Sequence, residues 1–382
     1  MIALRILAFV AGGSIVGWVG ISAIRSVVLP RGVPVLLTQA VFVDLRRVFD
    51  AVAKRLGTYE RRDRLMALYP ALGLIALPFV WVVLVMAAFT PMYWAVGVHW
   101  RRAFMESGSS LTTLGYIAPS NMGAHVLGVT EATMGLGLVA LLISYLPSIY
   151  AAFQRRELKV ALLEVRAGRP PWAVNWIVRH HRIGWLDAGG GMFAEWEEWF
   201  ADIEETHTSL PALAYFRSPL PNRSWVTAAG AVLDAAALWD STVDTPTTPE
   251  SNIVIRAGFL SLRRIADYFG IDHDHTPAPT DPISIERCEF EAACDALAAA
   301  GVPVKADRDQ AWRDFAGWRV NYDRVLIALA TVVMAPLAPW SSDRSLPLRL
   351  RPRFSPLGVI RSVRAARQRN KEVAEGRAGT DE

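Results

Sequence analysis

The stretch from residue 106 to 119 combines a short amphipathic run with two threonines, a leucine, a glycine and a tyrosine, Thr112 to Tyr116. Two long apolar segments, at residues 65–98 and 126–153, lie on either side of it. Irregular backbone between two spanning helices is tolerated only where protein buries it or where it lines water. On backbone grounds alone, the stretch is therefore a candidate pore loop.

Other residue clusters give weaker signals. The alternating run Asp272-His273-Asp274-His275 has side-chain types that bind metals, but it lies in a proline-rich loop, and we interpret it as a solvated turn without a metal. The glycines at 189–191 follow no strand and lack a phosphate-loop lysine. No Ser/His/Asp or Cys/His constellation stands out, so we do not expect an enzyme, and we expect no cofactor.

The composition predicts a membrane part followed by a mostly soluble part. The chain has 382 residues, of which 52% are hydrophobic, and its mean hydropathy is +0.25. The apolar excess is concentrated in residues 6–24, 65–98, 126–153 and 325–339. The net charge of +4 gives no indication of nucleic acid as a partner, whereas the basic N-terminal loop and tail favour an anionic membrane surface.

The N-terminal segments predict one helix across the membrane and one along it. Residues 6–24 are uncharged and about as long as the ~20 residues that span hydrocarbon. We favour a retained helix within residues 1–30 over a cleaved signal peptide, because no clear cleavage site follows. Residues 31–64 are rich in arginine, which places them in the cytoplasm, with an amphipathic helix over 44–64.

The pore region is predicted to cover residues 65–155. It comprises an outer helix at 65–98, a re-entrant helix and loop at 103–118, and an inner helix at 126–154. The basic loop before it and the pair Arg155-Arg156 after it both belong on the cytoplasmic side, so residues 99–131 are expected outside.

The remainder is predicted to be a helical cytoplasmic domain, residues 156–343, with a basic tail, residues 344–382. Residues 325–337 are apolar but cut short by prolines, so we expect them to be buried in this domain or against the membrane. The tail is a candidate for contact with anionic lipid headgroups. Four of its arginines are the proposed contacts: Arg361, Arg364, Arg367 and Arg369.

The order of outer helix, short helix, LTTLGY and inner helix resembles the two-helix pore unit of potassium channels. The family signature is T-[TS]-V-G-Y-G, and this chain matches its first five positions with leucine in place of valine. The resemblance covers about a quarter of the chain. It implies an ion-selectivity filter in which a threonine hydroxyl and backbone carbonyls replace the hydration shell of K⁺. The filter residues would be Thr112, Thr113, Leu114, Gly115 and Tyr116.

The chain departs from the family pattern at three positions. Ile117 replaces the second filter glycine, Ala118 replaces an acidic residue, and Ser109 aligns with the pore-helix glutamate of many relatives. A β-branched residue strongly disfavours the positive φ that glycine adopts freely. These departures predict a filter with fewer sites or weaker discrimination among cations.

Residues of the inner helix are candidates for gating and for attracting cations. Gly135 and Gly137 are hinge candidates, with close helix packing as the alternative. Pro147 is expected to kink the helix near its cytoplasmic end. Glu131 is expected at the external pore entrance, where it either concentrates cations or sits in headgroup water.

The sequence thus predicts a mainly α-helical, multi-pass protein of the plasma membrane with its C-terminal half in the cytoplasm. The function that the resemblance implies is passage of monovalent cations through a homotetrameric pore. The alternative is a membrane-anchored scaffold or sensor that does not conduct.

Overall fold

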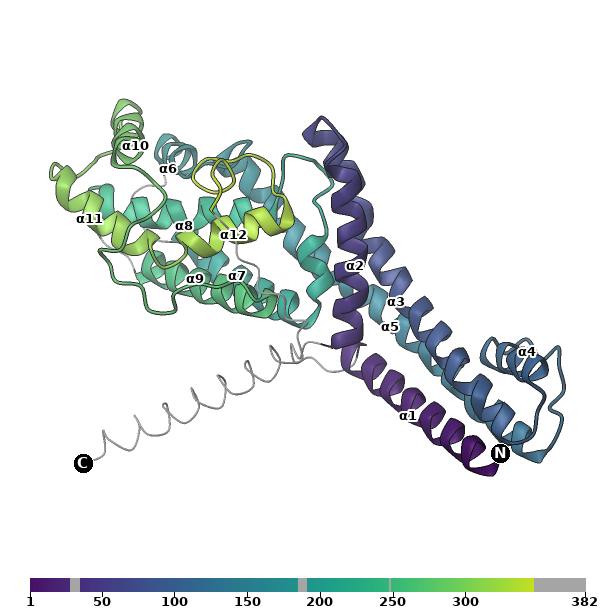
Figure 1. The fold of residues 1–382 in the computed structure, drawn as a ribbon. Coiled ribbons are helices and arrows are strands. Elements are labelled where there is room, and N and C mark those ends of the chain that lie inside the picture. The colour runs from purple at the N-terminus through teal and green to yellow at the C-terminus, as the bar shows by residue number, and fades with distance from the viewer. Residues whose placement is uncertain (28–34, 185–190, 247–248, 347–382) are drawn as a thin grey trace, which may run out of the picture.

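The computed structural model describes residues 1–27, 35–184, 191–246 and 249–346. These residues form helices and no strand, apart from an isolated bridge between Val243 and Val304. Figure 1 shows a rod of long helices that joins a larger body of shorter helices at one end. The tail arginines expected to contact lipid lie outside the described residues.

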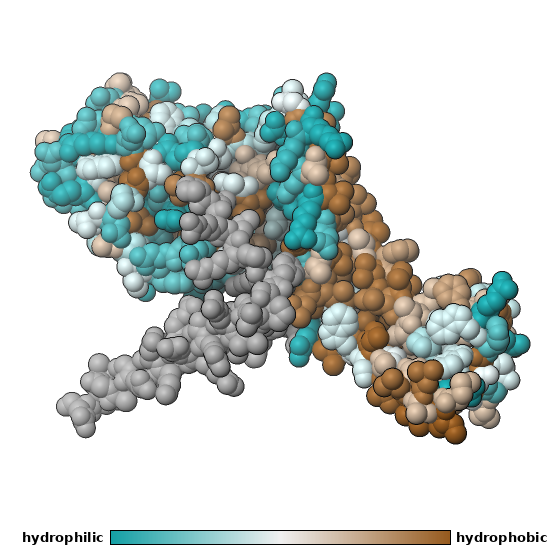
Figure 2. Space-filling view, viewed as in Figure 1, coloured by the Kyte–Doolittle hydropathy of each residue, from teal (hydrophilic) through white to brown (hydrophobic). Residues whose placement is uncertain are grey.

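Three helices are long and apolar enough to cross a membrane: α1 (Ile2–Val27), α3 (Tyr59–Ala95) and α5 (Met122–Ala167). They lie together in the rod, where α1 packs against α3. Gly12 allows the close approach, since a Cβ there would meet the Ala88 carbonyl oxygen at 2.6 Å. Hydrophobic residues cover much of the rod surface, whereas hydrophilic residues prevail over the helical body (Figure 2). Such a distribution suits a membrane protein.

The helix bounds correct two predictions. The amphipathic helix expected over 44–64 is instead α2 (Leu36–Ala53). A non-helical segment at residues 54–58 separates it from α3. Gly57 and Thr58 favour this break, because glycine disfavours a helix interior and threonine suits the position before a helix. The inner helix was expected to end at 154, but α5 continues to Ala167 because Val160 and Leu163 on its extension pack into the core of the helical body.

The helical body is built around α8 (Trp225–Thr242), which is buried on nearly every side. The other helices of the body are α6 (Ala173–Arg182), α7 (Gly191–Ser209), η2 (Pro211–Tyr215), α9 (Pro249–Phe269), α10 (Arg287–Ala299), α11 (Arg308–Arg319) and α12 (Asp323–Val333). The apolar residues of α12 lie in the same core, which confirms that the segment beginning at 325 is buried. No described part of this body is long and apolar enough to span a membrane.

A buried cation stabilises the centre of the helical body. Arg319 is fully buried and contacts the carboxylates of Asp234 and Asp323, while the Tyr322 hydroxyl donates to Asp234 over 2.9 Å. Arg319 also donates to the carbonyl of Trp340. Since an unpaired charge in such a core is strongly unfavourable, these contacts fix α11 and α12 against α8.

Arg156 joins the rod to the helical body. Its guanidinium is fully buried and donates to the carbonyls of Leu213 and Phe216, each over 2.8 Å. Nη1, which donates to the Leu213 carbonyl, also lies 3.3 Å from Nε2 of His207 on α7, and Nδ1 of that ring lies 2.8 Å from the Ile203 carbonyl. These partners require a neutral imidazole that donates from Nδ1 and accepts at Nε2.

His207 should make the stability of the protein sensitive to acid. Burial, together with the charge of Arg156, holds the pKa of His207 well below its usual value of about 6.5. Below about pH 6.5 this histidine is protonated in the unfolded chain but stays neutral in the folded protein, so stability is lost as pH falls. The protein should therefore be less stable at pH 5.5 than at pH 7.5, with this residue contributing on the order of 1 kcal/mol to the difference.

Unfolding by urea, followed by tryptophan fluorescence in detergent at the two pH values, measures this loss. His207→Gln, which keeps an acceptor for Arg156, should remove that part of the pH dependence. His125→Gln, at an exposed histidine of α5, is the matched control and should retain it. Equal pH dependence in the wild type and in His207→Gln would show that His207 is not the group responsible.

Candidate functional site

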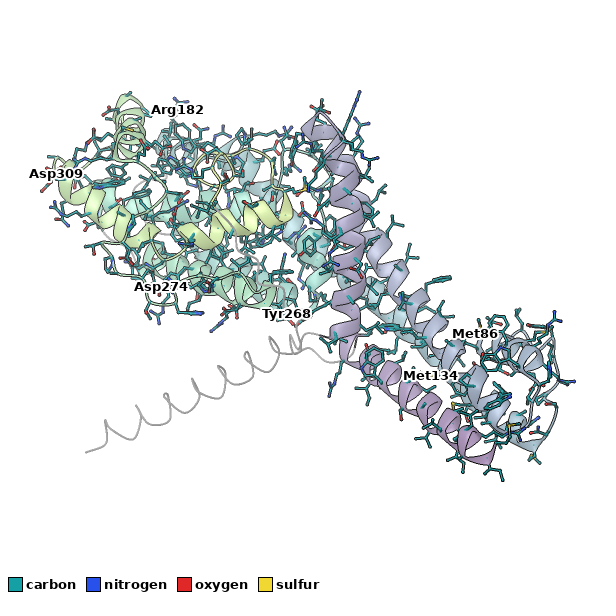
Figure 3. All side chains as sticks on the ribbon, viewed as in Figure 1. Met86, Met134, Arg182, Tyr268, Asp274 and Asp309 are labelled. Atoms are coloured by element: carbon teal, nitrogen blue, oxygen red, sulfur yellow. The ribbon has the colours of Figure 1, made fainter. Side chains whose placement is uncertain are left out.

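The short helix α4 (Trp100–Leu111) lies between α3 and α5 in sequence and packs against both at the far end of the rod (Figure 1). The Tyr93 hydroxyl of α3 donates to Ser110 over 3.3 Å, and Ser107 donates to Glu131 of α5 over 2.6 Å. Met86 of α3, labelled in Figure 3, also lies beside α4, with its carbonyl 3.4 Å from the Ser107 hydroxyl. Side chains of both long helices thus fix the position of α4.

The C-terminal end of α4 approaches α5 closely because α5 carries glycine there. A Cβ at Gly135 would lie 2.2 Å from the Leu111 carbonyl oxygen, a distance that no side chain tolerates. Gly137 has nothing within 4 Å of the position of its missing Cβ. Of the two hinge candidates, Gly135 therefore has a packing reason to be glycine. The α5 helix continues through Pro147 without interruption.

The loop after α4 is held from within by Ser109. The backbone amides of Leu114 and Gly115 both donate to the Ser109 carbonyl, over 3.1 and 3.3 Å, and the amide of Ile117 donates to the Ser109 hydroxyl over 3.2 Å. Two residues of the loop have a positive φ, Thr113 (+55°) and Gly115 (+65°). For a β-branched threonine this is a rare conformation, which costs of order 1–3 kcal/mol.

Four carbonyls of the loop, those of residues 113–116, remain unused, while most of its amides donate to α4. Within the described residues, no donor reaches the carbonyl oxygens of residues 113–116. The Thr113 hydroxyl donates to the carbonyl of Thr112 over 2.7 Å, and the Thr112 hydroxyl donates back to Gly108. The loop can therefore offer a row of oxygen ligands.

Tyr116 connects the loop to the side of α4. Its hydroxyl donates to the Met105 carbonyl over 3.1 Å, although 57% of the residue surface is exposed. Leu114 is 71% exposed.

Glu131 does not lie where the sequence suggested. Its side chain is fully buried against α4, so it neither faces water at a pore entrance nor sits among headgroups. The sequence placed it near the start of the inner helix, but α5 begins at Met122, more than two turns earlier, and those turns carry it into the packed interior. Its role is to hold Ser107 of α4.

Sequence reasoning missed the residues that hold the ends of the loop. Arg102 pairs with the buried Glu106 over 2.8 Å and donates to the Ala118 carbonyl over 3.1 Å. Asn121 caps α5 by accepting from the amide of Ala124 over 2.9 Å. The Arg102–Glu106 spacing of four and the asparagine before a helix were both visible signals.

Comparisons of the chain with known protein families, with curated proteins and with solved structures find no match. The class that the fold itself defines is a helical membrane protein with three membrane-length helices. The argument for its function therefore depends on the geometry of α4 and the loop.

Gly135 and Gly137 provide a paired test of the packing around α4. Gly135→Ala should force the end of α4 away from α5 and destabilise the protein by about 1–3 kcal/mol, the usual effect of overpacking. Gly137→Ala should stabilise it by up to about 1 kcal/mol, because alanine restricts the unfolded chain. Thermal unfolding of both variants in detergent measures the difference. Equal effects would show that Leu111 does not lie against Gly135.

Proposed function

We propose that this protein conducts monovalent cations, K⁺ among them, through a pore lined by the loop Thr112 to Tyr116. The observation that carries the proposal is the asymmetry of this loop, in which three amides donate to Ser109 while four successive carbonyls accept nothing from the described residues. Carbonyl rings with such free oxygens replace the hydration shell of a permeant cation. Outside such a role, free carbonyls at membrane depth are strongly unfavourable.

The pore requires several copies of the chain. One chain supplies one loop, so a closed ring of carbonyls needs rotational symmetry, and we propose a homotetramer. The exposure of Leu114 and Tyr116 supports this assembly, because both are covered once copies meet around an axis. The same arrangement makes α4 a re-entrant helix between α3 and α5.

The membrane in this proposal is the plasma membrane, with α4 and its loop at the external side. The segment between α1 and α3 carries many arginines, which favours the cytoplasm for it and for the helical body. In that orientation Arg156 joins the inner helix α5 to the cytoplasmic body, so a change in the body would act on the pore.

The second candidate is a scaffold or sensor in the membrane that does not conduct. Ile117 favours it, because this residue replaces a filter glycine and does not take a positive φ. The outermost coordination site of a potassium filter therefore lacks its usual backbone.

Ion flux into liposomes that contain the purified protein tests conduction. Uptake of Rb⁺ or K⁺ by the wild type should be lost in Gly115→Asp, because a side chain at a positive φ distorts the loop and its carboxylate crowds the ion path. Arg313→Ala, at an exposed position of α11, is the control and should conduct as the wild type does. No flux of any monovalent cation from protein shown to be tetrameric would exclude conduction and favour the scaffold.

Ile117→Gly tests the interpretation of the divergent position. Glycine allows the outer part of the loop to adopt the conformation that isoleucine prevents, so the ratio of K⁺ to Na⁺ permeability should rise. Reversal potentials under bi-ionic conditions measure this ratio. A ratio equal to that of the wild type would refute the role given to Ile117.

A further inference from the structure

A group of metal-ligating side chains lies in the helical body, far along the chain from the candidate pore. Asp267 is in the last turn of α9, and His273 and His275 are in the loop that follows. One ligand atom from each residue lies within 4.8 Å of the others. Asp274, labelled in Figure 3, marks this loop beside α9 at the edge of the body.

His273 is prepared to bind through one particular nitrogen. Its Nδ1 lies 3.2 Å from the Ile271 carbonyl, which accepts a hydrogen bond and therefore favours the Nδ1–H tautomer. The lone pair is then on Nε2, which is shielded from solvent and has no hydrogen-bond partner among the described residues. A buried imidazole nitrogen without a partner is unfavourable unless something else occupies it.

The other two ligands converge on the same point. The rings of His273 and His275 have centroids 4.4 Å apart, and Nε2 of His275 lies 3.8 Å from a carboxylate oxygen of Asp267. The backbone holds this arrangement, because Arg263 donates to the His275 carbonyl over 2.8 Å and the Thr276 amide donates to Asp274 over 2.9 Å.

We propose that Asp267, His273 and His275 bind a divalent transition-metal ion of the zinc class. Two imidazoles and one carboxylate suit Zn²⁺ and its neighbours, whereas Ca²⁺ and Mg²⁺ prefer oxygen ligands alone. In a tetrahedral site with bonds of ~2.0–2.1 Å, ligand atoms lie about 3.4 Å apart, so the side chains need to close by roughly 1 Å. Water would complete the fourth position.

The positive charge of Arg263 does not prevent metal binding. Burial, and to a smaller extent the charge of Arg263, lowers the pKa of His273. A lowered pKa keeps the imidazole neutral, which is the form that binds a metal ion. The guanidinium itself is committed to the Asn321 carbonyl and side chain and to the His275 carbonyl. It therefore positions the loop instead of occupying the site.

A metal here would link the end of α9 to the loop that leads to α10. Phe269, two residues after Asp267, packs edge-on against Tyr215, with ring centroids 5.6 Å apart. Tyr215 in turn packs against Tyr69 of α3, at 5.3 Å. The proposed ion would thus stabilise the face of the body that contacts the rod. The inference does not depend on conduction by the pore.

Zinc binding to the purified full-length protein in detergent, measured by equilibrium dialysis after treatment with a chelator, tests the proposal. The wild type should bind one Zn²⁺ per chain more than His275→Gln does, and His273→Gln should weaken binding at least tenfold. His275 is largely exposed, so its variant should fold normally.

His181→Gln, at a histidine elsewhere in the body, is the matched control. It should retain the wild-type stoichiometry. Co²⁺ in place of Zn²⁺ should give the visible absorption of a tetrahedral nitrogen and oxygen site in the wild type and lose it in His275→Gln. Equal zinc binding by the wild type and by both histidine variants would overturn the proposal.

Discussion

The structure of the rod depends on one constraint, that a backbone group within the membrane must find its partner inside the protein. The long helices α1, α3 and α5 satisfy it through their own hydrogen bonds. The loop after α4 cannot, and a single residue, Ser109, provides acceptors for three of its amides. The carbonyls of residues 113–116 accept nothing from the described residues, and this imbalance is the physical basis of the proposed pore.

The packing around α4 follows from the same constraint. A helix that enters between two others must be held by side chains, and Tyr93, Ser107 and Glu131 do this from both sides. Close approach then requires a small residue, which Gly135 supplies against the Leu111 carbonyl. Gly135 and Glu131, which the sequence suggested for gating and for cation attraction, thus both serve the packing of α4.

The helical body and the rod are mechanically joined through α5. Arg156, on the extension of that helix, is buried among carbonyls of the η2 segment and beside His207. Protonation of this histidine would therefore disturb the contacts that hold the end of α5 in the body.

The sequence by itself determined the three membrane-length helices, the short helix before the TTLGY loop and the helical character of the rest, because apolar length and period are local properties. It misjudged where α5 ends, since packing extends that helix beyond its local pattern. It also missed the break after α2, although the local residues Gly57 and Thr58 favour it.

Only the tertiary structure decided the environment of Glu131, the role of Ser109 and the meeting of Asp267 with His273 and His275. The sequence alone indicated that the two histidines lie in a solvated turn. It gave no reason to add Asp267, which lies six residues before the first histidine. Distances between side chains depend on how the chain folds back on itself, and a sequence pattern read along the chain does not contain them.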